Sequence, residues 1–206
     1  MKLRGSRVIV RPMVRADLDQ MIAWRPFADP LYKPFDFPKR SKADHIRWFE
    51  GRRRDASRRM YVIENERRQV IGSLTLREID GQGSARLGIT IAADFVSQGY
   101  GTEALAVFMD HYFEEMGFAR MVLDVAATNL RAVRTYLSLG FRQVGHHYRP
   151  ASDESYALIR DDPRYRHLLR FFRRVGAGYQ ITFYDMILTR EEWRTRTRQK
   201  DGQAPA

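Results

Sequence analysis

The stretch that decides the fold runs from Leu87 to Leu105 and reads LGITIAADFVSQGYGTEAL. Its first five residues form an apolar segment that is typical of a short β-strand. Gly99 and Gly101 stand at the start of a segment whose apolar residues recur at helical spacing as far as Gly117. Glycine lets a backbone turn tightly and lets a ligand approach it closely, and the first N–H groups of a helix have no internal partner. The stretch therefore predicts a strand, a loop and a helix start that can hold phosphate oxygens.

The composition restricts the class of protein. A length of 206 residues fits a single domain, and the absence of cysteine excludes disulfides, thiolate metal ligands and a cysteine nucleophile. No apolar run is long enough to span a membrane, and the first residues lack the apolar segment of a secretory signal. We therefore expect a cytoplasmic protein without a membrane-bound part. The net charge of +11 fits either simple solubility or an anionic partner such as RNA, the ribosome or a polyphosphate cofactor.

Strands and helices are predicted on both sides of the deciding stretch. Met121 to Val125 is apolar apart from Asp124, the pattern of a buried parallel strand, so a strand–helix–strand unit with a right-handed crossover is expected. The prolines and aromatic residues between Pro26 and Pro38 form a stiff loop, which is either a surface loop or one wall of a substrate pocket. The other strands and helices expected before residue 87 are strand 8–10, helix 16–24, a helix from Ser41, and the hairpin strands 60–64 and 70–77.

The C-terminal third is predicted with less regularity. A helix over 129–139 ends at Gly140, a strand follows near 142–147, and a final strand covers 179–188. We expect one domain over residues 1–190 with an insertion at about 148–178, followed by a polar, frayed tail over 191–206. Within the insertion, the segment from Asp161 to Gly178 has apolar residues on one side and arginines on the other. It predicts an amphipathic surface helix, which could also contact RNA or a second subunit.

A dinucleotide-binding turn is the first alternative for the glycine pair. Gly99, Gly101 and Ala104 match its pattern, and Asp124 stands 20 residues beyond Ala104. In that motif the first glycine follows its strand almost at once. Here the seven residues 92–98 intervene, and only one strand–helix–strand unit is visible, so we reject this interpretation.

Two segments together resemble the GNAT N-acetyltransferases. FVSQGYGTEAL at 95–105 resembles that family's acetyl-coenzyme A loop. NLRAVRTYLSLGF at 129–141 resembles its second signature, in which Asn, Ala, Tyr and Gly-Phe recur at fixed spacing. The resemblance covers roughly residues 8–145 and the strand 179–188. Segments 9–12, 184–186 and 191–193 further resemble the branch that acetylates the N-termini of ribosomal proteins (the RimJ/RimL-like branch).

The resemblance implies an α/β fold (α+β): a mixed, mostly antiparallel central sheet flanked by helices and splayed between the parallel strands 87–91 and 121–125. It also implies that acetyl-CoA is the acyl donor and that its pantetheine arm lies in the splay. The residues that the resemblance assigns to the cofactor are the strand backbone at Ile89 and Ile91, the loop N–H groups at Gln98, Gly99, Tyr100, Gly101 and Thr102, the side chain of Asn129, and Arg134 near the adenosine phosphates.

The chemistry requires a neutral amine and a stabilised leaving thiolate. By resemblance, Tyr136 is the acid that protonates the thiolate, although a tyrosine at this position could equally be a core residue. The base is open, because Arg86 stands where the related branch often has Glu, and an arginine does not act as a base at neutral pH. Val96 likewise replaces a polar residue usual in the loop. The remaining candidate bases, each better explained as a solvated surface carboxylate, are Glu78, Asp80, Asp153 and Glu154; a water chain is the other route.

The sequence therefore predicts an enzyme that transfers an acetyl group directly from acetyl-CoA to a primary amine. A protein or peptide N-terminus is the leading acceptor. Aminoglycosides and polyamines are the enzymatic alternative, ranked second because such polycations would favour an acidic pocket and this chain is basic. A non-catalytic module that binds RNA or the ribosome is the alternative from another class. The five histidines show no metal-ligand spacing, so no metal is expected, and the chain is expected to be a monomer or a homodimer.

Overall fold

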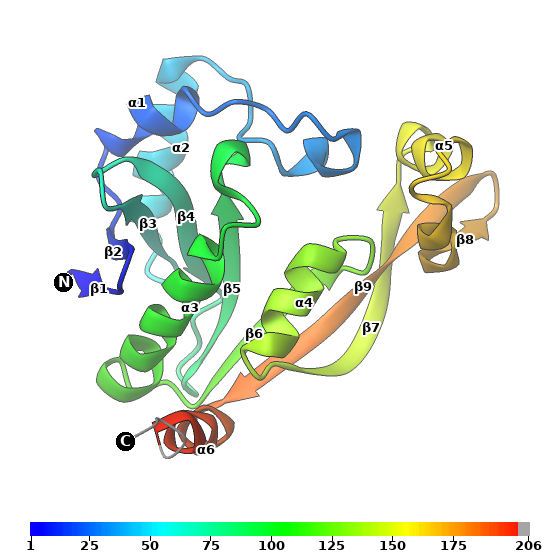
Figure 1. Ribbon diagram of the computed structural model, residues 1–206. Helices are drawn as coiled ribbons and strands as arrows, with labels where there is room; N and C mark the ends of the chain where they lie inside the picture. The colour runs from blue at the N-terminus through cyan, green and yellow to red at the C-terminus, as the bar shows by residue number, and fades with distance from the viewer. Residues whose placement is uncertain (202–206) are drawn as a thin grey trace.

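The computed structural model describes residues 1–201, with the side chains of residues 1–199. One sheet runs through the molecule in the strand order β1-β2-β3-β4-β5-β6-β9-β7, and β8 pairs with the outer part of β9 (Figure 1). The strands are β1 (Leu3–Arg4), β2 (Val8–Pro12), β3 (Arg59–Asn65), β4 (Val70–Arg77), β5 (Ser84–Ile91), β6 (Arg120–Ala126), β7 (Arg142–Ala151), β8 (Phe172–Val175) and β9 (Gly178–Thr189).

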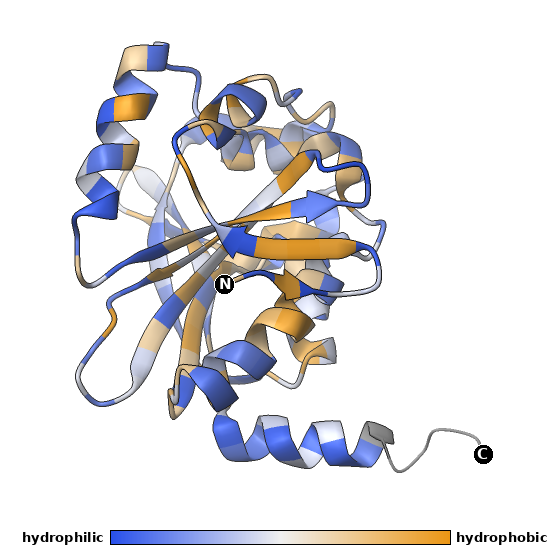
Figure 2. Cartoon of the chain, turned by 90° about the vertical axis from the view of Figure 1, so that its left-hand side faces the viewer, coloured by the Kyte–Doolittle hydropathy of each residue, from blue (hydrophilic) through white to orange (hydrophobic). Residues whose placement is uncertain are grey.

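Helices cover both faces of the sheet. They are α1 (Asp17–Ile22), α2 (Lys42–Arg53), α3 (Tyr100–Asp110), α4 (Leu130–Ser138), α5 (Asp153–Asp161) and α6 (Arg190–Asp201), and shorter helical turns occur at 30–35, 93–95, 111–115 and 166–171. Tyr61 and Ile63 of β3 belong to the main core under α3, whereas Val62 between them packs with α1 and α2. Since successive strand residues point to opposite faces, α3 and α1/α2 lie on opposite sides of the sheet. Figure 2 shows the apolar strands between these two helical layers.

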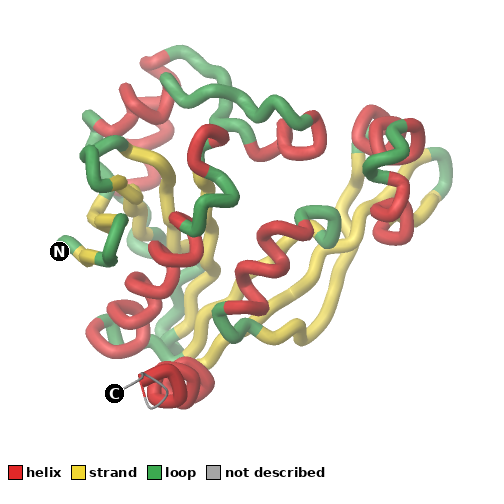
Figure 3. Tube along the Cα trace, in the orientation of Figure 1, coloured by secondary structure: helices red, strands yellow, loops and turns green. Residues whose placement is uncertain are grey.

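The sheet opens between β5 and β6, the only two neighbouring strands that run parallel within the described part of the chain. β5 and β6 pair over just three positions, and the pairing ends at Arg86 and Val122. Beyond this point β5 remains bonded to β4, and β6 to β9, so the two halves diverge (Figures 1 and 3). Ile89 and Ile91 of β5 therefore have no strand partner on the side facing β6. The mixed, mostly antiparallel and splayed sheet that the sequence predicted is confirmed.

The insertion differs from its prediction. Its regular helix is α5, which ends at Asp161, and the segment expected to be an amphipathic helix is a short 3₁₀ turn followed by strand β8. Asp162 is extended (ψ 116°) because the following Pro163 disfavours helical geometry in the residue before it. The four residues of β8 then pair with β9 from Phe172–Ile181 to Val175–Gly178. The arginines of this segment accordingly do not line one face of a helix.

The expected frayed tail is also wrong for the residues that the structure describes. Helix α6 continues directly from β9, and Trp193 is buried in the main core, where its indole N–H donates to Asp110 at 2.8 Å. The Glu192 carboxylate caps the start of α6 by accepting hydrogen bonds from the backbone N–H and the hydroxyl of Thr189. Residues 202–206 lie outside the described part of the chain. Within that part, no helix is long and apolar enough to cross a membrane.

Candidate active site

A cavity of about 520 Å³ occupies the gap between β5 and β6. Its lining includes the inner edge of β5, the loop before α3, one side of α4, and β6 with part of β9. The face of the sheet that α3 covers carries Leu87, Ile89 and Ile91 of β5. Asp124 of β6 lies on the opposite face. The cavity therefore connects the two faces of the sheet through the gap. Such a passage allows two reactants to meet from opposite sides.

The start of α3 leaves its first N–H groups available to a ligand. Gly99 has a left-handed backbone (φ +85°), a conformation that glycine adopts at little cost, and provides no side-chain cap. The first backbone hydrogen bond of the helix runs from Glu103 N–H to Gly99 O at 3.0 Å. At Gly101 an added Cβ would lie 3.3 Å from Ile91, so glycine lets this turn approach β5 closely. Both features suit an anion at the helix start.

Arg7 fastens this loop to the N-terminal hairpin. Its backbone N–H and Nε both donate to the Glu103 carboxylate, at 2.6 and 3.0 Å, and its Nη1 donates to Gln98 O at 3.1 Å. Its guanidinium also lies over the Tyr100 ring, 4.9 Å from the centroid. Arg7 thereby neutralises the one acidic residue in the first turn of α3 and adds positive charge beside Gly99. The sequence analysis missed it, because Arg7 and Glu103 are 96 residues apart.

Helix α4 brings two of the predicted residues to the cavity. Asn129 is the N-cap of α4, and its side-chain oxygen accepts from Ala132 N–H at 3.2 Å, so it has a structural role whatever else it binds. Tyr136 lies two turns further on, 7% exposed, with its ring edge against Phe141. Burial and the nearby negative charge of Asp124 raise the pKa of Tyr136 well above its ordinary value. The hydroxyl therefore stays protonated at neutral pH and can donate a proton into the cavity.

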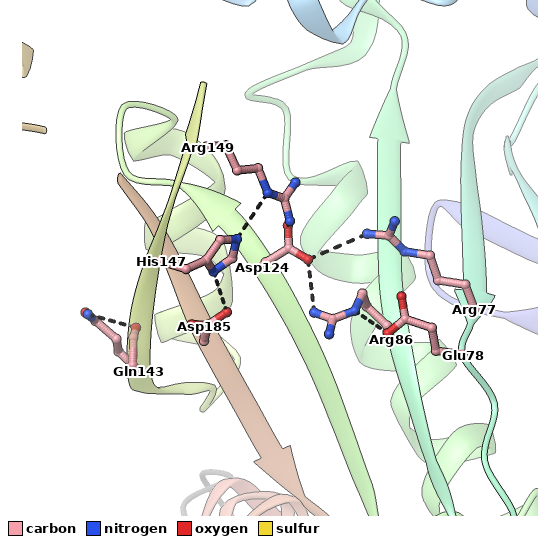
Figure 4. Close-up of polar contacts among 9 residues, drawn as sticks. Arg77, Glu78, Arg86, Asp124, Gln143, His147, Arg149 and Asp185 are labelled. Carbon is pink, nitrogen blue, oxygen red and sulfur yellow. Dashed lines mark hydrogen bonds and ion pairs between the residues drawn. The ribbon is translucent and has the colours of Figure 1, made fainter. Parts of the chain in front are cut away.

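On the opposite side of the gap, three arginines converge on Asp124 (Figure 4). Arg86 donates to Asp124 Oδ1 at 3.0 Å, Arg149 donates to Oδ2 at 2.6 Å, and an Arg77 nitrogen lies 3.7 Å from Oδ1. The Asp124 side chain is only 5% exposed. Arg86 also donates to Glu78 at 2.7 Å. We call Asp124 with Arg77, Arg86 and Arg149 the arginine cluster.

The arginine cluster is supported from β7 and β9. Arg149 Nε donates to His147 Nε2 at 3.1 Å, and His147 Nδ1 lies 2.9 Å from Asp185 Oδ1. Because an arginine nitrogen only donates, His147 must accept at Nε2 and donate from Nδ1 to Asp185. The Arg149 guanidinium also stacks 4.2 Å above Phe183, a residue that lines the cavity. These contacts hold Arg149 in one position at the cavity.

The loop between α1 and α2 forms another wall of the cavity. Phe27 and Phe35 line it, and Arg131 of α4 lies 4.2 Å from the Tyr32 ring centroid. The insertion reaches the same loop through the Tyr165 hydroxyl, which donates to Asp29 at 2.6 Å. Of the two interpretations of this proline-rich loop, the structure therefore favours the pocket wall.

The structure brings together most, but not all, of the predicted site residues. Those that line the cavity are Ile89, Ile91, Gly99, Gly101, Thr102, Asn129 and Tyr136, and Val96 is also present. Gln98, Tyr100 and Arg134 are absent from the lining; Arg134 is an exposed residue of α4. The candidate bases are absent as well: Glu78 is bound to Arg86, Asp80 closes a turn, and Asp153 and Glu154 occupy the first turn of α5. Asp124 is the one carboxylate that the described residues contribute to the lining.

Comparison with known proteins places the chain in a family. The model of the acetyltransferase (GNAT) domain matches residues 7–142, which carry the gap, the α3 start and α4. The chain belongs to the GNAT acetyltransferases. A curated relative, the spermidine N(1)-acetyltransferase of Vibrio cholerae serotype O1, is 28% identical over 153 residues, covering 69% of this chain and 83% of the relative.

Solved structures share the fold. A chimeric spermidine N-acetyltransferase from Vibrio cholerae superposes with a TM-score of 0.68 at 21% identity, covering 93% of this chain and 100% of that one. The Vibrio cholerae enzyme in complex with CoA and spermine superposes with a TM-score of 0.65 at 20% identity, covering 92% and 99%. The comparisons support the GNAT superfamily and not the narrower ribosomal-protein branch.

The protein is accordingly an N-acetyltransferase that uses acetyl-CoA. The observed site fits this donor: an unpaired β5 edge, a helix start with free N–H groups, and a glycine at the closest approach of α3 to β5.

Proposed function

We propose that this enzyme acetylates the primary amine of a small molecule. The observation that carries the proposal is the cavity that passes through the β5–β6 gap, with Tyr136 on the α4 side and Asp124 and Arg77 of the arginine cluster on the other. A polyamine of the spermidine class is the first acceptor to test, because it is the acceptor in the name of the curated relative. That similarity favours the polyamine alternative over the protein N-terminus, which the sequence analysis ranked first.

The proposed roles of the residues follow from their positions. The pantetheine arm of acetyl-CoA would bond to the free β5 backbone at Ile89 and Ile91, beside Asn129. The pyrophosphate would rest on the N–H groups from Gln98 to Thr102, where Arg7 adds positive charge, and Arg134 would approach the adenosine phosphates from the exposed side of α4. Acetyl-CoA supplies the activated acyl group. Tyr136 would protonate the departing thiolate, an acid role typically worth about 10²- to 10⁴-fold in rate.

The pKa of Tyr136 gives this role a pH signature. A hydroxyl that is the active acid must be protonated, and burial keeps it so beyond the ordinary tyrosine range. Any loss of rate at alkaline pH that comes from Tyr136 should therefore begin above about pH 10. A rate limited by loss of this proton near pH 8 would contradict the assignment.

The test follows thiol release from acetyl-CoA against spermidine, spermine, an aminoglycoside and a peptide with a free N-terminus. Release with a small amine is expected. Release with the peptide alone, or with none of these amines and none of a set of free amino acids, would refute the proposed function. Tyr136→Phe should lower kcat by about 10²- to 10⁴-fold, with the acetyl-CoA Kd almost unchanged. Tyr179→Phe, in the outer part of β9 and away from the cavity lining, is the matched control and should leave kcat unaltered.

A further inference from the structure

The acceptor side of the cavity has an excess of positive charge. Arg77 and Arg131 line the cavity itself, and Arg86 and Arg149 are bound to the single carboxylate of the lining, Asp124. Glu78 is the other acid in direct contact with the arginine cluster, and its side chain is 60% exposed. Two carboxylates therefore face four guanidinium groups. A polycationic acceptor would find no free acid at this position, because Asp124 is already shared by three arginines.

Two of these arginines keep unused hydrogen-bond donors beside the cavity. Within residues 1–199, the side chain of Arg77 makes no hydrogen bond, and its contact with Asp124 is a 3.7 Å ion pair. Arg149 uses Nε for His147 and Nη2 for Asp124, which leaves Nη1 without a partner in the same part of the chain. The two side chains bind opposite oxygens of Asp124, so they flank it as a pair.

The donor of Arg149 is held in place before a ligand arrives. Asp124 is almost fully buried on the central strand β6, and Arg149 is further fixed by Phe183 and by the His147–Asp185 pair. A guanidinium presents its donors in a plane that matches the two oxygens of a carboxylate. Because Arg149 is already ordered, little of its side-chain entropy is lost when an anion binds.

We propose, on the basis of the proposed function, that the natural acceptor carries a carboxylate as well as its primary amine, and that Arg77 and Arg149 bind this carboxylate. The acceptor is thus an amino-acid-like molecule. The same positive field disfavours an ammonium ion at the gap and favours the neutral amine that attacks the thioester. This explains how an active site without a free carboxylate base can still bind its nucleophile in the reactive form.

The experiment compares matched acceptors that differ only in charge. Each pair is an amino acid and its uncharged amide, in α-amino and ω-amino series of increasing chain length, with spermidine alongside. For the preferred pair, the wild-type kcat/KM should favour the carboxylate by about 10- to 100-fold, the value of a hydrogen bond to a charged group. Arg77→Gln and Arg149→Gln should each reduce this ratio towards one. Arg174→Gln, an exposed arginine of β8, is the control and should leave the ratio unchanged.

A binding measurement separates this inference from the proposed function. Calorimetric titration of the CoA-loaded protein with the same pairs requires no turnover. Tighter binding of the carboxylate to the wild type than to Arg77→Gln supports the inference. Two results would overturn the inference and leave amine acetylation standing. One is equal binding of the carboxylate and the amide. The other is that spermidine is the best acceptor and that Arg77→Gln raises the kcat/KM for spermidine. Failure of every amine to release thiol counts against the proposed function instead, and the titration still decides the carboxylate site.

Discussion

Two charged clusters in this enzyme have opposite composition. In the first, between β2, β3 and α1, one mostly buried arginine serves two acids: Arg11 donates to both oxygens of Asp17 at 2.7 and 2.8 Å and to Glu64 at 2.8 Å. The more exposed Arg68 lies 3.6 Å from the other Glu64 oxygen. In the arginine cluster, one acid serves three arginines. Among the mostly buried groups the first cluster has an excess of negative charge, whereas the second has an excess of positive charge.

The clusters also differ in their access to water. In the first, the side chains of Arg11, Asp17 and Glu64 are 17%, 5% and 9% exposed, so all three are withdrawn from solvent. In the arginine cluster only Asp124 is buried. Its arginines are 27% to 46% exposed, and Arg77 lines the cavity together with Asp124. A closed cluster can only stabilise the fold, whereas an open one retains donors for a ligand. The comparison suggests that charge was placed at the first cluster for stability and at the second for binding.

The largest expected effect comes from breaking the closed cluster. Arg11→Met removes the one mostly buried cation from two buried carboxylates and leaves Glu64 only its more exposed partner Arg68. Leaving buried charge uncompensated typically costs about 3–5 kcal/mol of unfolding free energy. Urea denaturation monitored by circular dichroism measures the loss. The cavity is unaffected, so kcat of the remaining folded enzyme should match the wild type. Arg4→Met, an exposed change on β1, is the control; a loss below about 1 kcal/mol for Arg11→Met would show that the closed cluster is not stabilising.

A smaller effect is expected from the centre of the open cluster. Asp124→Asn keeps the shape and most hydrogen-bond acceptors but removes the charge, and water can solvate the arginines that lose their counter-ion. We expect a loss of about 1–3 kcal/mol in unfolding free energy. Glu78→Gln, which breaks a more exposed pair with the same Arg86, should cost less than about 1 kcal/mol. If Asp124→Asn destabilised the protein more than Arg11→Met, the distinction between a structural and a binding cluster would fail.

The sequence was informative where the decisive contacts are local. Gly99 and Gly101, the helical spacing after them and the Asn129–Gly140 segment all act within a few turns, so β5, α3, β6 and α4 could be predicted in order. The insertion was mispredicted because β8 exists through its pairing with β9, and that pairing competes successfully with the helical pattern of the same residues.

The acceptor side could not be predicted, because its neighbours are set by strand register. Asp124 stood out as the one polar residue in an apolar run, but nothing local indicated its partners. Arg77 and Arg86 reach it from β4 and β5, and Arg149 from β7, across the β6–β9–β7 pairing. The fold around the proposed acetyl-CoA site could therefore be predicted from the sequence. The charge around the arginine cluster could be found only from the structure.

The smallest expected difference between the two clusters is in how their contribution to stability depends on salt concentration. Raising the ionic strength from about 0.1 M to about 1 M shortens the Debye length from about 10 Å to about 3 Å, which screens solvent-exposed charges far more than buried ones. The loss of unfolding free energy in Arg11→Met should therefore be nearly the same at the two salt concentrations. The smaller loss in Asp124→Asn should decrease at high salt, by a measurable amount that is less than about 1 kcal/mol. Urea denaturation of both variants and the wild type at each concentration gives the comparison. Equal salt dependence of the two losses would mean that water reaches both clusters alike, and the open cluster would then have no special access to a ligand.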